Sequence, residues 1–568
     1  MKQKKKTERR YTPAPTMKAY MGNLEAHGDK VLYRYYADAT CRKINDMTYK
    51  TFTQNVKHIA AAFQTLGLAG KRIAIIGDTS PAWVASYLAT VAGGSVAIPM
   101  DKELQFSEIL GFLSASEADA IVYSKGFNAK FDEVVGSHDS VKYFIPVDPA
   151  DMPSREAEGV IPFDRLLAMG KEVQEYDFPT ISDTNRMAEM LFTSGTTGTS
   201  KCVMISEKNI LAAMNSACET VEFFPEDTIV SVLPIHHTYE LCCMLAGMNY
   251  GMTVGINDSI KHALKSFANY APTGLVLVPL FLETMYKRIW DEAERKGKAK
   301  TLRFGLKLSH FLRTFGIDIR KKLFGEILAA FGGRLCKVVC GGAPLNPEIV
   351  SKFDEFGVTI MEGYGITECS PLISVNPYFA LKRNSVGPAV PCCTVRIDDA
   401  KKNDKGFMEG EIVVKGDNVM LGYYRNDAEN AKAFTEDGWY RTGDIGYMDA
   451  DGYIFITGRK KSVIVLENGK NVFPEEVEEY LGRISGILES VVVGRTNEDG
   501  HVTLTAIVVP DPTLFPGLSQ AEIEEKIKAD IHQMNKKLVA FKQVKAVEFR
   551  AEPFEKTTSR KIKRHLVK

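Results

Sequence analysis

The sequence predicts an α/β protein, with a large N-terminal domain of layered α/β subdomains plus a β-rich subdomain, and a small mobile C-terminal α+β domain. In the first part of the chain, short apolar runs such as 72–76 and 120–123 alternate with segments of helical periodicity. That alternation is typical of parallel strands joined by crossover helices. From about Cys392 short strands separated by turn residues take over, which indicates a β-rich unit.

The first layered region carries two expected helices, over 51–66 and 81–91. The longest apolar stretch, 83–100, predicts a buried helix that turns into a core strand. Ser and Gly residues interrupt this stretch, so we expect no transmembrane helix.

The second layered region spans 231–340. Its apolar runs at 274–279 and 337–340 are expected to be core strands. Between them, about 280–331 forms a long insert of mixed charge, which we expect to be helical.

The C-terminal part is expected to contain short strands at 410–414 and 451–455, and a hairpin around Asn468–Gly469. Helices are expected over 473–481, entered through Pro474, and over 519–538. The second helix carries a capping box and an apolar stripe, formed by Ser519, Glu522, Ile523, Ile527, Ile531, Met534 and Leu538.

A charged segment, Arg459–Lys461, lies between the β-rich part of the sequence and the C-terminal part in which helices are expected. Such a segment suits a hinge between two domains, and a plain surface turn explains it equally well. We expect an N-terminal domain over 1–458, a hinge over 459–461 and a C-terminal lid domain over 462–568.

Composition is that of an ordinary globular protein, with 45% apolar and 25% charged residues. Seventy-one basic residues balance seventy-one acidic ones, which excludes a general attraction to nucleic acid. The basic run from Lys2 to Arg10 has no apolar segment after it, so it fits a solvated tail rather than a signal peptide. The ten cysteines lack spacing suited to zinc, and we expect reduced thiols in a cytoplasmic protein.

The most informative motif is a loop rich in hydroxyls, glycines and one cation between two strand-like runs, 190–192 and 202–205. Its glycines let backbone N–H groups turn toward an anion, and its lysine adds a positive charge, which suits a polyphosphate. It is not a Walker A loop, because the lysine does not follow the second glycine directly. A solvated turn is the alternative. The loop consists of Thr193, Ser194, Gly195, Thr196, Thr197, Gly198, Thr199, Ser200 and Lys201.

Two further motifs suit a nucleotide. The run Gly341–Leu345 follows an expected strand and permits the close approach of a flat ring, although a tight turn explains it too. The run Glu362–Glu368 places an aromatic ring, a hydroxyl and two carboxylates in what we expect to be one short turn. A capped helix start is its alternative. In it, Tyr364 suits stacking on a purine, Thr367 a phosphate and Glu368 the oxygen ligation of Mg²⁺.

Two later features point the same way. Asp444 follows a glycine in the run 440–444 and is suited to accept both hydroxyls of a ribose. The tail 555–564 is a basic loop, for which a solvated end is the alternative.

Together these motifs resemble those of the adenylate-forming superfamily, which includes acyl-CoA synthetases, luciferases and the adenylation domains of peptide synthetases. The resemblance runs from about Leu32 to Arg564, with the main motifs in order. Among the branches, the chain is most similar to bacterial long-chain fatty acid:CoA ligases, through its helical insert and the ending 554–558.

The resemblance implies a two-step reaction. A carboxylate attacks the α-phosphate of ATP to give acyl-AMP and pyrophosphate, and the thiol of CoA then displaces AMP. Within this reaction the loop from Thr193 to Lys201 would hold the β- and γ-phosphates, Thr367 the α-phosphate and Glu368 the Mg²⁺. The nucleoside would lie against Gly341, Gly342, Ala343, Glu362, Gly363, Tyr364 and Gly365, with Asp444 and Arg459 at the ribose.

The mobile domain would supply the remaining groups. Lys561 aligns with the lysine that bridges the carboxylate and the α-phosphate, where a cation stabilises the transition state. The usual glycine before that lysine is Arg560 here. Lys461 occupies the hinge position, and Gly469 and Lys470 would face CoA in the second step. His237 is expected to gate or pack the acyl and CoA channel rather than act as a base.

The function implied is an AMP-forming fatty acid:CoA ligase that uses ATP, Mg²⁺ and CoA, with a long-chain fatty acid as substrate. The alternatives are adenylation for a carrier protein or for another carboxylate, and a non-catalytic protein that binds nucleotide or acyl groups. We expect a cytoplasmic protein and no nucleic acid partner. Peripheral contact with the inner membrane face and a homodimer are left open.

Overall fold

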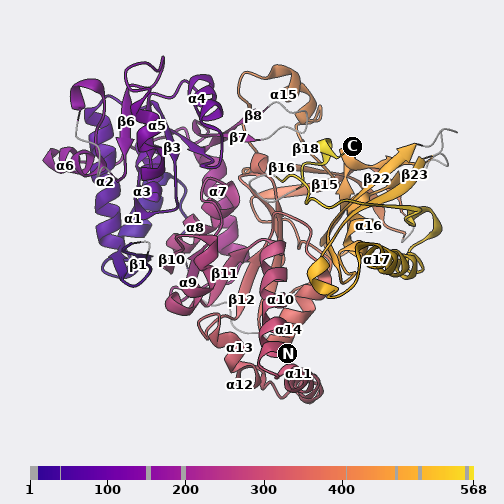
Figure 1. The fold of residues 1–568 in the computed structure, drawn as a ribbon. Helices are drawn as coiled ribbons and strands as arrows, with labels where there is room; N and C mark the ends of the chain where they lie inside the picture. The colour runs from indigo at the N-terminus through magenta and orange to yellow at the C-terminus, as the bar shows by residue number, and fades with distance from the viewer. Residues whose placement is uncertain are drawn as a thin grey trace. The chain divides into compact units, whose positions relative to one another are not determined.

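The computed structural model describes residues 11–38, 40–148, 155–193, 200–403, 406–466, 471–496, 502–556 and 562–567 (Figure 1). Its contacts divide the chain into two compact units. The first contains Met1–Thr394 and Lys415–Phe434, and the second contains Val395–Val414 and Thr435–Lys568. The predicted boundaries at 458 and 462, and the hinge between them, stay predictions.

The first sheet of unit 1 is mostly parallel at its centre, as the alternation of strands and helices predicts. Its helix α3 starts at Pro81 and is capped by Ser80, whose side chain accepts from the backbone N–H of Trp83. Helix α2 packs against α1, α3 and α6. In order across the sheet, the strands are β17 (Gly422–Tyr423), β8 (Lys201–Ser206), β7 (Met187–Thr193), β4 (Val96–Met100), β3 (Arg72–Ile76), β5 (Ala120–Tyr123) and β6 (Tyr143–Pro146). The helices are α1 (Met17–Glu25), α2 (Tyr49–Thr65), α3 (Pro81–Ala92), α4 (Phe106–Ala115), α5 (Asn128–Asp132) and α6 (Phe163–Glu172).

The second sheet of unit 1 has a parallel centre from β13 to β1 and antiparallel strands at both edges. Its order is β14 (Leu372–Val375), β13 (Thr359–Gly365), β12 (Lys337–Cys340), β11 (Gly274–Leu277), β9 (Thr228–Ser231), β10 (Thr253–Ile256), β1 (Val31–Tyr36) and β2 (Ile44–Thr48). The helices are α7 (Glu207–Thr220), α8 (Thr238–Tyr250), α9 (Ala263–Tyr270), α10 (Pro279–Arg295), α11 (Ala299–Thr314), α12 (Arg320–Leu323), α13 (Gly325–Ala329) and α14 (Pro347–Phe356). Helix α15 (Asp427–Ala433) contacts β17 of the first sheet. The predicted helical insert is therefore confirmed as α10 to α13.

Within the described residues, unit 2 contains three small sheets, of four, two and three strands. In its C-terminal part, α16 and α17 pack their apolar stripes on β22 and β23, which forms one core. The strands are β15 (Cys393–Lys402), β16 (Met408–Gly416), β18 (Tyr440–Met448), β19 (Ile454–Arg459), β20 (Ile464–Val465), β21 (Asn471–Val472), β22 (Ile487–Thr496), β23 (Val502–Pro510) and β24 (Ala546–Phe549). The helices are α16 (Pro474–Leu481) and α17 (Gln520–Asn535).

Short 3₁₀ turns connect several of these elements. They are η1 (Lys125–Phe127), η2 (Glu156–Glu158), η3 (Ile260–His262), η4 (Thr367–Cys369), η5 (Lys460–Ser462), η6 (Pro512–Leu514), η7 (Ala540–Lys542) and η8 (Arg564–Leu566). In the part of the chain that the structure describes, we find no helix that is long and apolar enough to cross a membrane.

Most elements coincide with their predictions, including both runs of the first sheet and the capping box of α17 at Ser519 and Glu522. Two predictions are wrong in detail. The predicted strand 451–455 is a strand only from Ile454, where β19 begins, because Asp451 and Gly452 belong to a turn closed by Asp449, and Gly452 has a positive φ of 83° there. The run 362–368 is not one short turn, because Glu362–Gly365 completes strand β13 and only the residues after it turn.

Candidate active site

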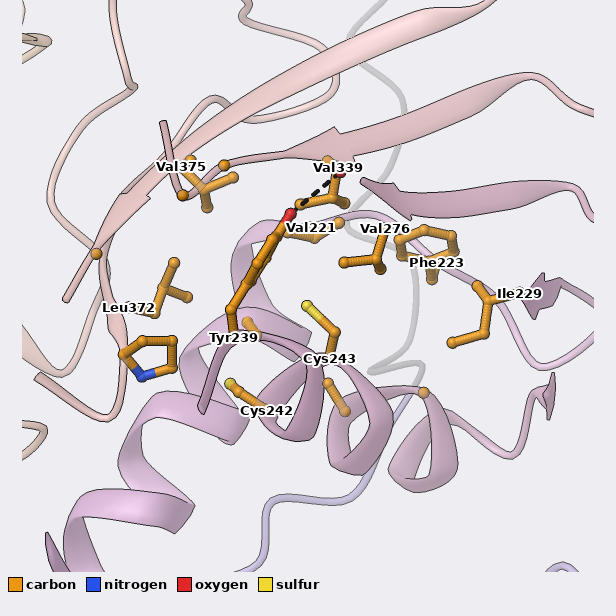
Figure 2. A pocket seen from close by; sticks show the side chains of 18 of the residues that line it. Val221, Phe223, Ile229, Tyr239, Cys242, Cys243, Val276, Val339, Leu372 and Val375 are labelled. Atoms are coloured by element: carbon orange, nitrogen blue, oxygen red, sulfur yellow. Dashed lines mark hydrogen bonds between the residues drawn. The ribbon is translucent and has the colours of Figure 1, made fainter. Parts of the chain in front are cut away.

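An apolar cavity lies between helices α7 and α8 and the strands β9, β11, β12, β13 and β14 (Figure 2). About 820 Å³ of space, counted out to its mouth, is free of protein atoms. Its lining is almost wholly hydrocarbon and sulfur, as is typical of sites for apolar small molecules. The lining residues are Ala217, Val221, Phe223, Ile229, Tyr239, Cys242, Cys243, Ala246, Gly247, Tyr250, Met252, Val276, Val339, Gly341, Gly342, Gly363, Tyr364, Gly365, Pro371, Leu372 and Val375.

Helix α8 forms one wall because its cavity residues recur at helical spacing. Tyr239, Cys243, Ala246 and Tyr250 are three or four positions apart, so they share one face of the helix. Between the two tyrosines, the small side chains of Cys243 and Ala246 leave room beside the sheet. Gly247 holds the helix close to β9, since a Cβ there would lie only 3.0 Å from Cδ1 of Ile229.

The glycines of the two nucleotide motifs line one part of the cavity. Gly341 and Gly342 follow β12, and Gly363 and Gly365 pair with Val375 and Leu372 of β14. In Figure 2, Leu372 and Val375 lie on the side opposite Phe223 and Ile229. The glycine motifs therefore border one side of the cavity.

The backbone at this border is too close for side chains. A Cβ at Gly341 would lie 3.0 Å from the carbonyl oxygen of Gly363, and one at Gly365 would collide with the carbonyl of Pro371. Gly342 has a φ of 84°, which also favours glycine. Ala343 follows on an exposed loop before α14. The glycines therefore permit close packing of the backbone at this border, and the approach of a flat ring to them stays a prediction.

Tyr239 is one of the few side chains with a polar atom that line the cavity. Its hydroxyl donates to the carbonyl oxygens of Val339 at 3.2 Å and Leu277 at 3.3 Å, where β12 and β11 end (Figure 2). Burial raises the pKa of this phenol well above its ordinary value, so the group stays a neutral donor. Sequence reasoning did not single out Tyr239, because nothing local marks a cavity wall.

Two buried carboxyl groups, Glu240 on α8 and Glu189 on β7, were also missed. Glu240 accepts from the hydroxyl of Ser231, and burial raises its pKa to about 8. Glu189 on β7 accepts a 2.7 Å hydrogen bond from the hydroxyl of Tyr87, and burial raises its pKa to about 7. Glu189 also lines a second, smaller cavity of about 240 Å³, together with Ser370.

The predicted phosphate loop connects β7 to β8. Thr193 and Lys201 are register partners at its two ends, and the hydroxyl of Thr193 lies 3.4 Å from the carbonyl oxygen of Lys201. The predicted order of strand, loop and strand is therefore confirmed. Ser194, Gly195, Thr196, Thr197 and Gly198 lie outside the described residues.

Lys201 is held by an acidic and an aromatic neighbour. Its ammonium group pairs with the carboxylate of Glu429 on α15 and lies 4.8 Å from the centre of the Tyr423 ring. The hydrogen bond from Lys201, with a second from Lys432, lowers the pKa of Glu429 to about 2. Neither Tyr423 nor Glu429 was expected from the sequence.

The predicted magnesium ligand belongs to the same cluster. Glu368 lies in η4, and its Oε1 accepts a 2.9 Å hydrogen bond from the hydroxyl of Tyr423. Its backbone carbonyl accepts from the N–H of Met420 at 2.8 Å, which fixes the turn. A half-buried carboxylate that shares the neighbour Tyr423 with a lysine suits a hard cation that bridges to phosphate oxygens, so the residues fit Mg²⁺. Thr367 begins the same turn.

His237 lies at the start of α8, two residues before the cavity wall begins at Tyr239. Its ring packs against His236 with 4.2 Å between the ring centres. Burial and the neighbouring His237 lower the pKa of His236 to about 3, although Asp101 lies 3.6 Å away. The role of His237, to gate or pack the channel rather than to act as a base, stays a prediction.

In unit 2 the two predicted ribose residues are in contact. Asp444 on β18 and Arg459 on β19 are register partners, and Nε of Arg459 lies 2.7 Å from Oδ1 of Asp444. Asp444 is buried, whereas the Arg459 side chain is 47% exposed. The next residues form η5, which contains Lys461. Gly469, Lys470 and Lys561 lie outside the described residues.

The motifs, the two sheets and the cavity define a nucleotide-dependent enzyme of a known class. Residues 23–424 match the sequence model of the AMP-binding enzyme family, and residues 476–561 match that of the AMP-binding enzyme C-terminal domain. The chain belongs to the AMP-binding enzyme family, and the predicted membership of the adenylate-forming superfamily is confirmed.

Its similar relatives include fatty acid ligases from distant organisms. A long-chain-fatty-acid–CoA ligase of Mycobacterium bovis, FadD15, is 27% identical over 95% of this chain and 92% of its own length. Long-chain-fatty-acid–CoA ligase 5 of Rattus norvegicus is 26% identical over 89% of this chain and 80% of its own length.

Solved structures share the fold. The adenylation domain of a carboxylate reductase from Mycobacterium chelonae aligns with a TM-score of 0.79 and 21% identity, over 98% of this chain and 90% of that one. The ATP-bound MatB of Rhodopseudomonas palustris aligns with a TM-score of 0.73 and 23% identity, over 96% of this chain and 98% of that one. The predicted α/β fold class is confirmed by these likenesses.

Proposed function

We propose that this enzyme is an ATP-dependent fatty acid:CoA ligase, which converts a long-chain fatty acid to acyl-AMP with release of pyrophosphate and transfers the acyl group to CoA. The observation that carries the proposal is the apolar cavity bordered by the glycine motifs. The relatives named as long-chain-fatty-acid–CoA ligases support the same substrate class.

The cavity chemistry favours an acyl chain over a polar substrate. None of its lining residues, all within the described ranges, carries a formal charge. Each methylene moved from water into such a cavity contributes about 0.8 kcal/mol. A carboxylate has no partner there, so the acid head group would stay at the border formed by Gly341 and Gly363.

The residues around Lys201 would meet the triphosphate. In this proposal Lys201 exchanges the carboxylate of Glu429 for phosphate oxygens, and Thr367 contacts the α-phosphate. Glu368 would hold Mg²⁺, which supplies charge neutralisation between phosphate oxygens. The roles of Ser194 to Gly198 in the loop stay proposals of the same kind.

The groups of unit 2 complete the proposed reaction. Asp444 would accept the ribose hydroxyls, and the guanidinium of Arg459 already orients that carboxylate. Lys561 would stabilise the charge on the pentavalent phosphorus. Lys461 as hinge and the Gly469–Lys470 turn as CoA contact are carried over from the family resemblance.

The test is CoA-dependent AMP formation across unbranched acids from acetate to oleate, with pyrophosphate exchange measured in parallel. We expect exchange with long acids and AMP release only when CoA is present. Exchange without CoA-dependent AMP release would favour a carrier protein as acceptor. A lack of exchange with every acid would contradict an enzyme and favour a binding protein.

A surface on the helical insert suits delivery of the acid from a bilayer. Helix α11 and the residue that follows it expose the rings of Phe304, Phe311 and Phe315 by 67%, 59% and 68%. Lys300, Arg303 and Lys307 lie exposed beside them. Aromatic rings flanked by cations are typical of helices that lie in a membrane interface.

Vesicle sedimentation tests this surface. We expect Phe304→Ser and Phe311→Ser together to reduce binding to anionic vesicles, and added salt to weaken it in the parent chain. Phe379→Ser, which removes a ring that is 75% exposed elsewhere, is the matched control. Binding that is equal in both variants would contradict the surface. A homodimer stays a prediction, which sedimentation velocity would check.

A further inference from the structure

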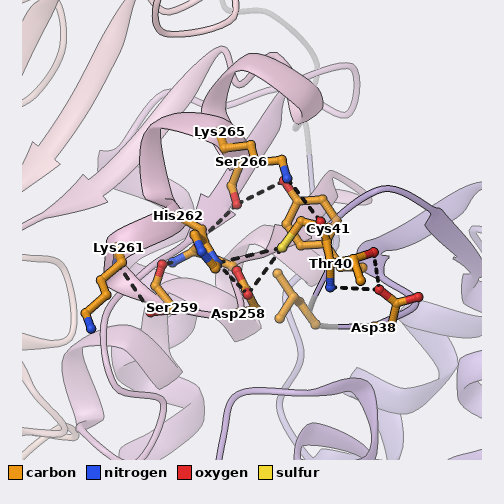
Figure 3. A network of polar contacts seen from close by, with 12 residues as sticks. Asp38, Thr40, Cys41, Asp258, Ser259, Lys261, His262, Lys265 and Ser266 are labelled. Atoms are coloured by element: carbon orange, nitrogen blue, oxygen red, sulfur yellow. Dashed lines mark hydrogen bonds and ion pairs between the residues drawn. The ribbon is translucent and has the colours of Figure 1, made fainter.

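Three side chains with metal-binding atoms meet outside the site described above (Figure 3). Cys41 lies in the connection between β1 and β2, and Asp258 and His262 lie just after β10. Strands β1 and β10 are parallel neighbours, so the segments that follow them emerge at the same edge of the sheet. Asp258 and His262 are four residues apart: Asp258 precedes η3, and His262 is its last residue.

The spacing of the three atoms is close to that of a tetrahedral metal site. Sγ of Cys41 lies 3.4 Å from Oδ2 of Asp258 and 3.7 Å from Nδ1 of His262, and the last two atoms are 2.8 Å apart. Tetrahedral zinc with ordinary bond lengths places sulfur about 3.5 Å from oxygen and about 3.6 Å from nitrogen, and nitrogen about 3.3 Å from oxygen. Two of the three separations already agree, and the third needs to open by about 0.5 Å.

The cluster is buried at Cys41 and exposed to solvent at Asp258 and His262. Cys41 is 4% exposed and has a φ of 53°, an unusual conformation for a residue other than glycine. The side chains of Asp258 and His262 are 28% and 44% exposed. A fourth ligand from solvent could therefore reach an ion held by the three.

The neighbouring charges are mixed. The ammonium group of Lys265 donates a 3.2 Å hydrogen bond to the carbonyl of Thr40, and its charge lowers the pKa of the Cys41 thiol. Burial and Asp258 act in the opposite direction and raise that pKa overall. A nucleophilic cysteine would need a lowered pKa, so a catalytic Cys–His–Asp arrangement is disfavoured.

We propose that Cys41, Asp258 and His262 form a binding site for a divalent transition metal ion of the zinc class, with solvent at the fourth position. Sulfur and imidazole ligands select such ions over Mg²⁺ and Ca²⁺. On binding, the thiol releases its proton to solvent and the thiolate joins the metal. The bound ion would cross-link the β1–β2 connection, through Cys41, to the segment before α9, through Asp258 and His262.

The test measures zinc retained by the full-length chain after chelator treatment, reloading with zinc sulfate and dialysis. We expect about one equivalent per chain in the parent, and near-complete loss in Cys41→Ser and in His262→Ala. With Co²⁺, the sulfur-to-metal charge-transfer absorption should appear in the parent and be absent from Cys41→Ser. Zinc should raise the Tm of the parent and leave that of His262→Ala unchanged.

Matched controls separate this site from other thiols and imidazoles. Cys336→Ser removes a half-buried thiol and His310→Ala an exposed imidazole, and both should retain zinc like the parent. If Cys41→Ser fails to fold, zinc retention by His262→Ala still tests the proposal, because the His262 side chain is 44% exposed and its truncation should leave the fold intact. A parent chain that retains no zinc, or retention that is equal in parent and His262→Ala, overturns the proposal.

Discussion

Tyr423 joins Glu368 to Lys201: its hydroxyl donates to Glu368 at 2.9 Å while the centre of its ring lies 4.8 Å from Nζ of Lys201. The arrangement depends on the two-residue strand β17, which pairs Tyr423 with Val203 of β8, two residues after Lys201. Lys201, the proposed phosphate ligand, and Glu368, the proposed magnesium ligand, therefore both contact Tyr423. This tyrosine lies far from Lys201 in the sequence.

Replacing Tyr423 by Phe should impair adenylation through Glu368. The change removes the hydrogen bond to the carboxylate and keeps the ring beneath Lys201. Hydrogen bonds to charged groups contribute about 1.5–3 kcal/mol, so kcat/KM for Mg·ATP should fall by roughly 10- to 100-fold. Pyrophosphate exchange at increasing Mg²⁺ concentrations measures this fall in kcat/KM. Tyr424→Phe, which alters the neighbouring hydroxyl near Arg72, is the control and should stay near the parent value.

Replacing Glu429 by Gln should make Lys201 more available to phosphate. The ion pair is partly exposed, with side chains 17% and 30% accessible, so the gain should be modest. We expect a KM for ATP lower by about three- to fivefold, equivalent to about 1 kcal/mol. Lys201→Met should instead raise it. A KM that rises in Glu429→Gln would show that the carboxylate positions Lys201 for catalysis rather than restraining it.

The sequence predicted the elements of the fold well because local patterns determine them. Buried parallel strands such as β3 and β12 are continuous apolar runs, and α17 begins at a capping box that can be read directly. The two errors arose at glycine-containing segments. A turn and a strand end there have the same composition, and only pairing with a neighbouring strand distinguishes them.

The site was predicted only in part. The glycine motifs, Asp444 and Arg459 could be singled out because each is a local pattern or matches the family resemblance, and the structure adds that Asp444 and Arg459 form an ion pair. Tyr239, Tyr423 and Glu429 were missed because their roles depend on contacts between distant segments, which no spacing reveals. The cluster at Cys41 shows the same limit, since 217 residues separate it from Asp258.

The buried carboxyl group of Glu240 should make stability depend on pH. Its pKa in the folded chain is raised to about 8, so the folded state holds a proton that the unfolded state releases near its ordinary value of about 4.3. The resulting stability is complete below the unfolded pKa, and it is lost as pH rises toward and through 8.

Urea unfolding from pH 5 to 9 tests this dependence. Glu240→Gln, which keeps a neutral side chain, should lose less stability than the parent over that range. Glu189, whose pKa is about 7, contributes in the same direction and leaves a residual slope. Glu219→Gln, on the exposed end of α7, is the control and should follow the parent. Parallel curves for parent and Glu240→Gln would contradict an uncharged Glu240.

Filling the cavity should shorten the acids that the enzyme accepts. Cys243 projects from α8 into the cavity between Tyr239 and Val276 (Figure 2), so Cys243→Phe places a ring in the path of the chain. Each methylene excluded from the cavity costs about 0.8 kcal/mol, which is about fourfold in kcat/KM. We expect oleate to lose most activity and short acids to keep theirs, as measured by CoA-dependent AMP formation. Cys243→Ser preserves the volume and should keep the parent profile. Equal losses for all chain lengths in Cys243→Phe would mean that the ring disturbs the nucleotide motifs instead, and that the acyl chain binds elsewhere.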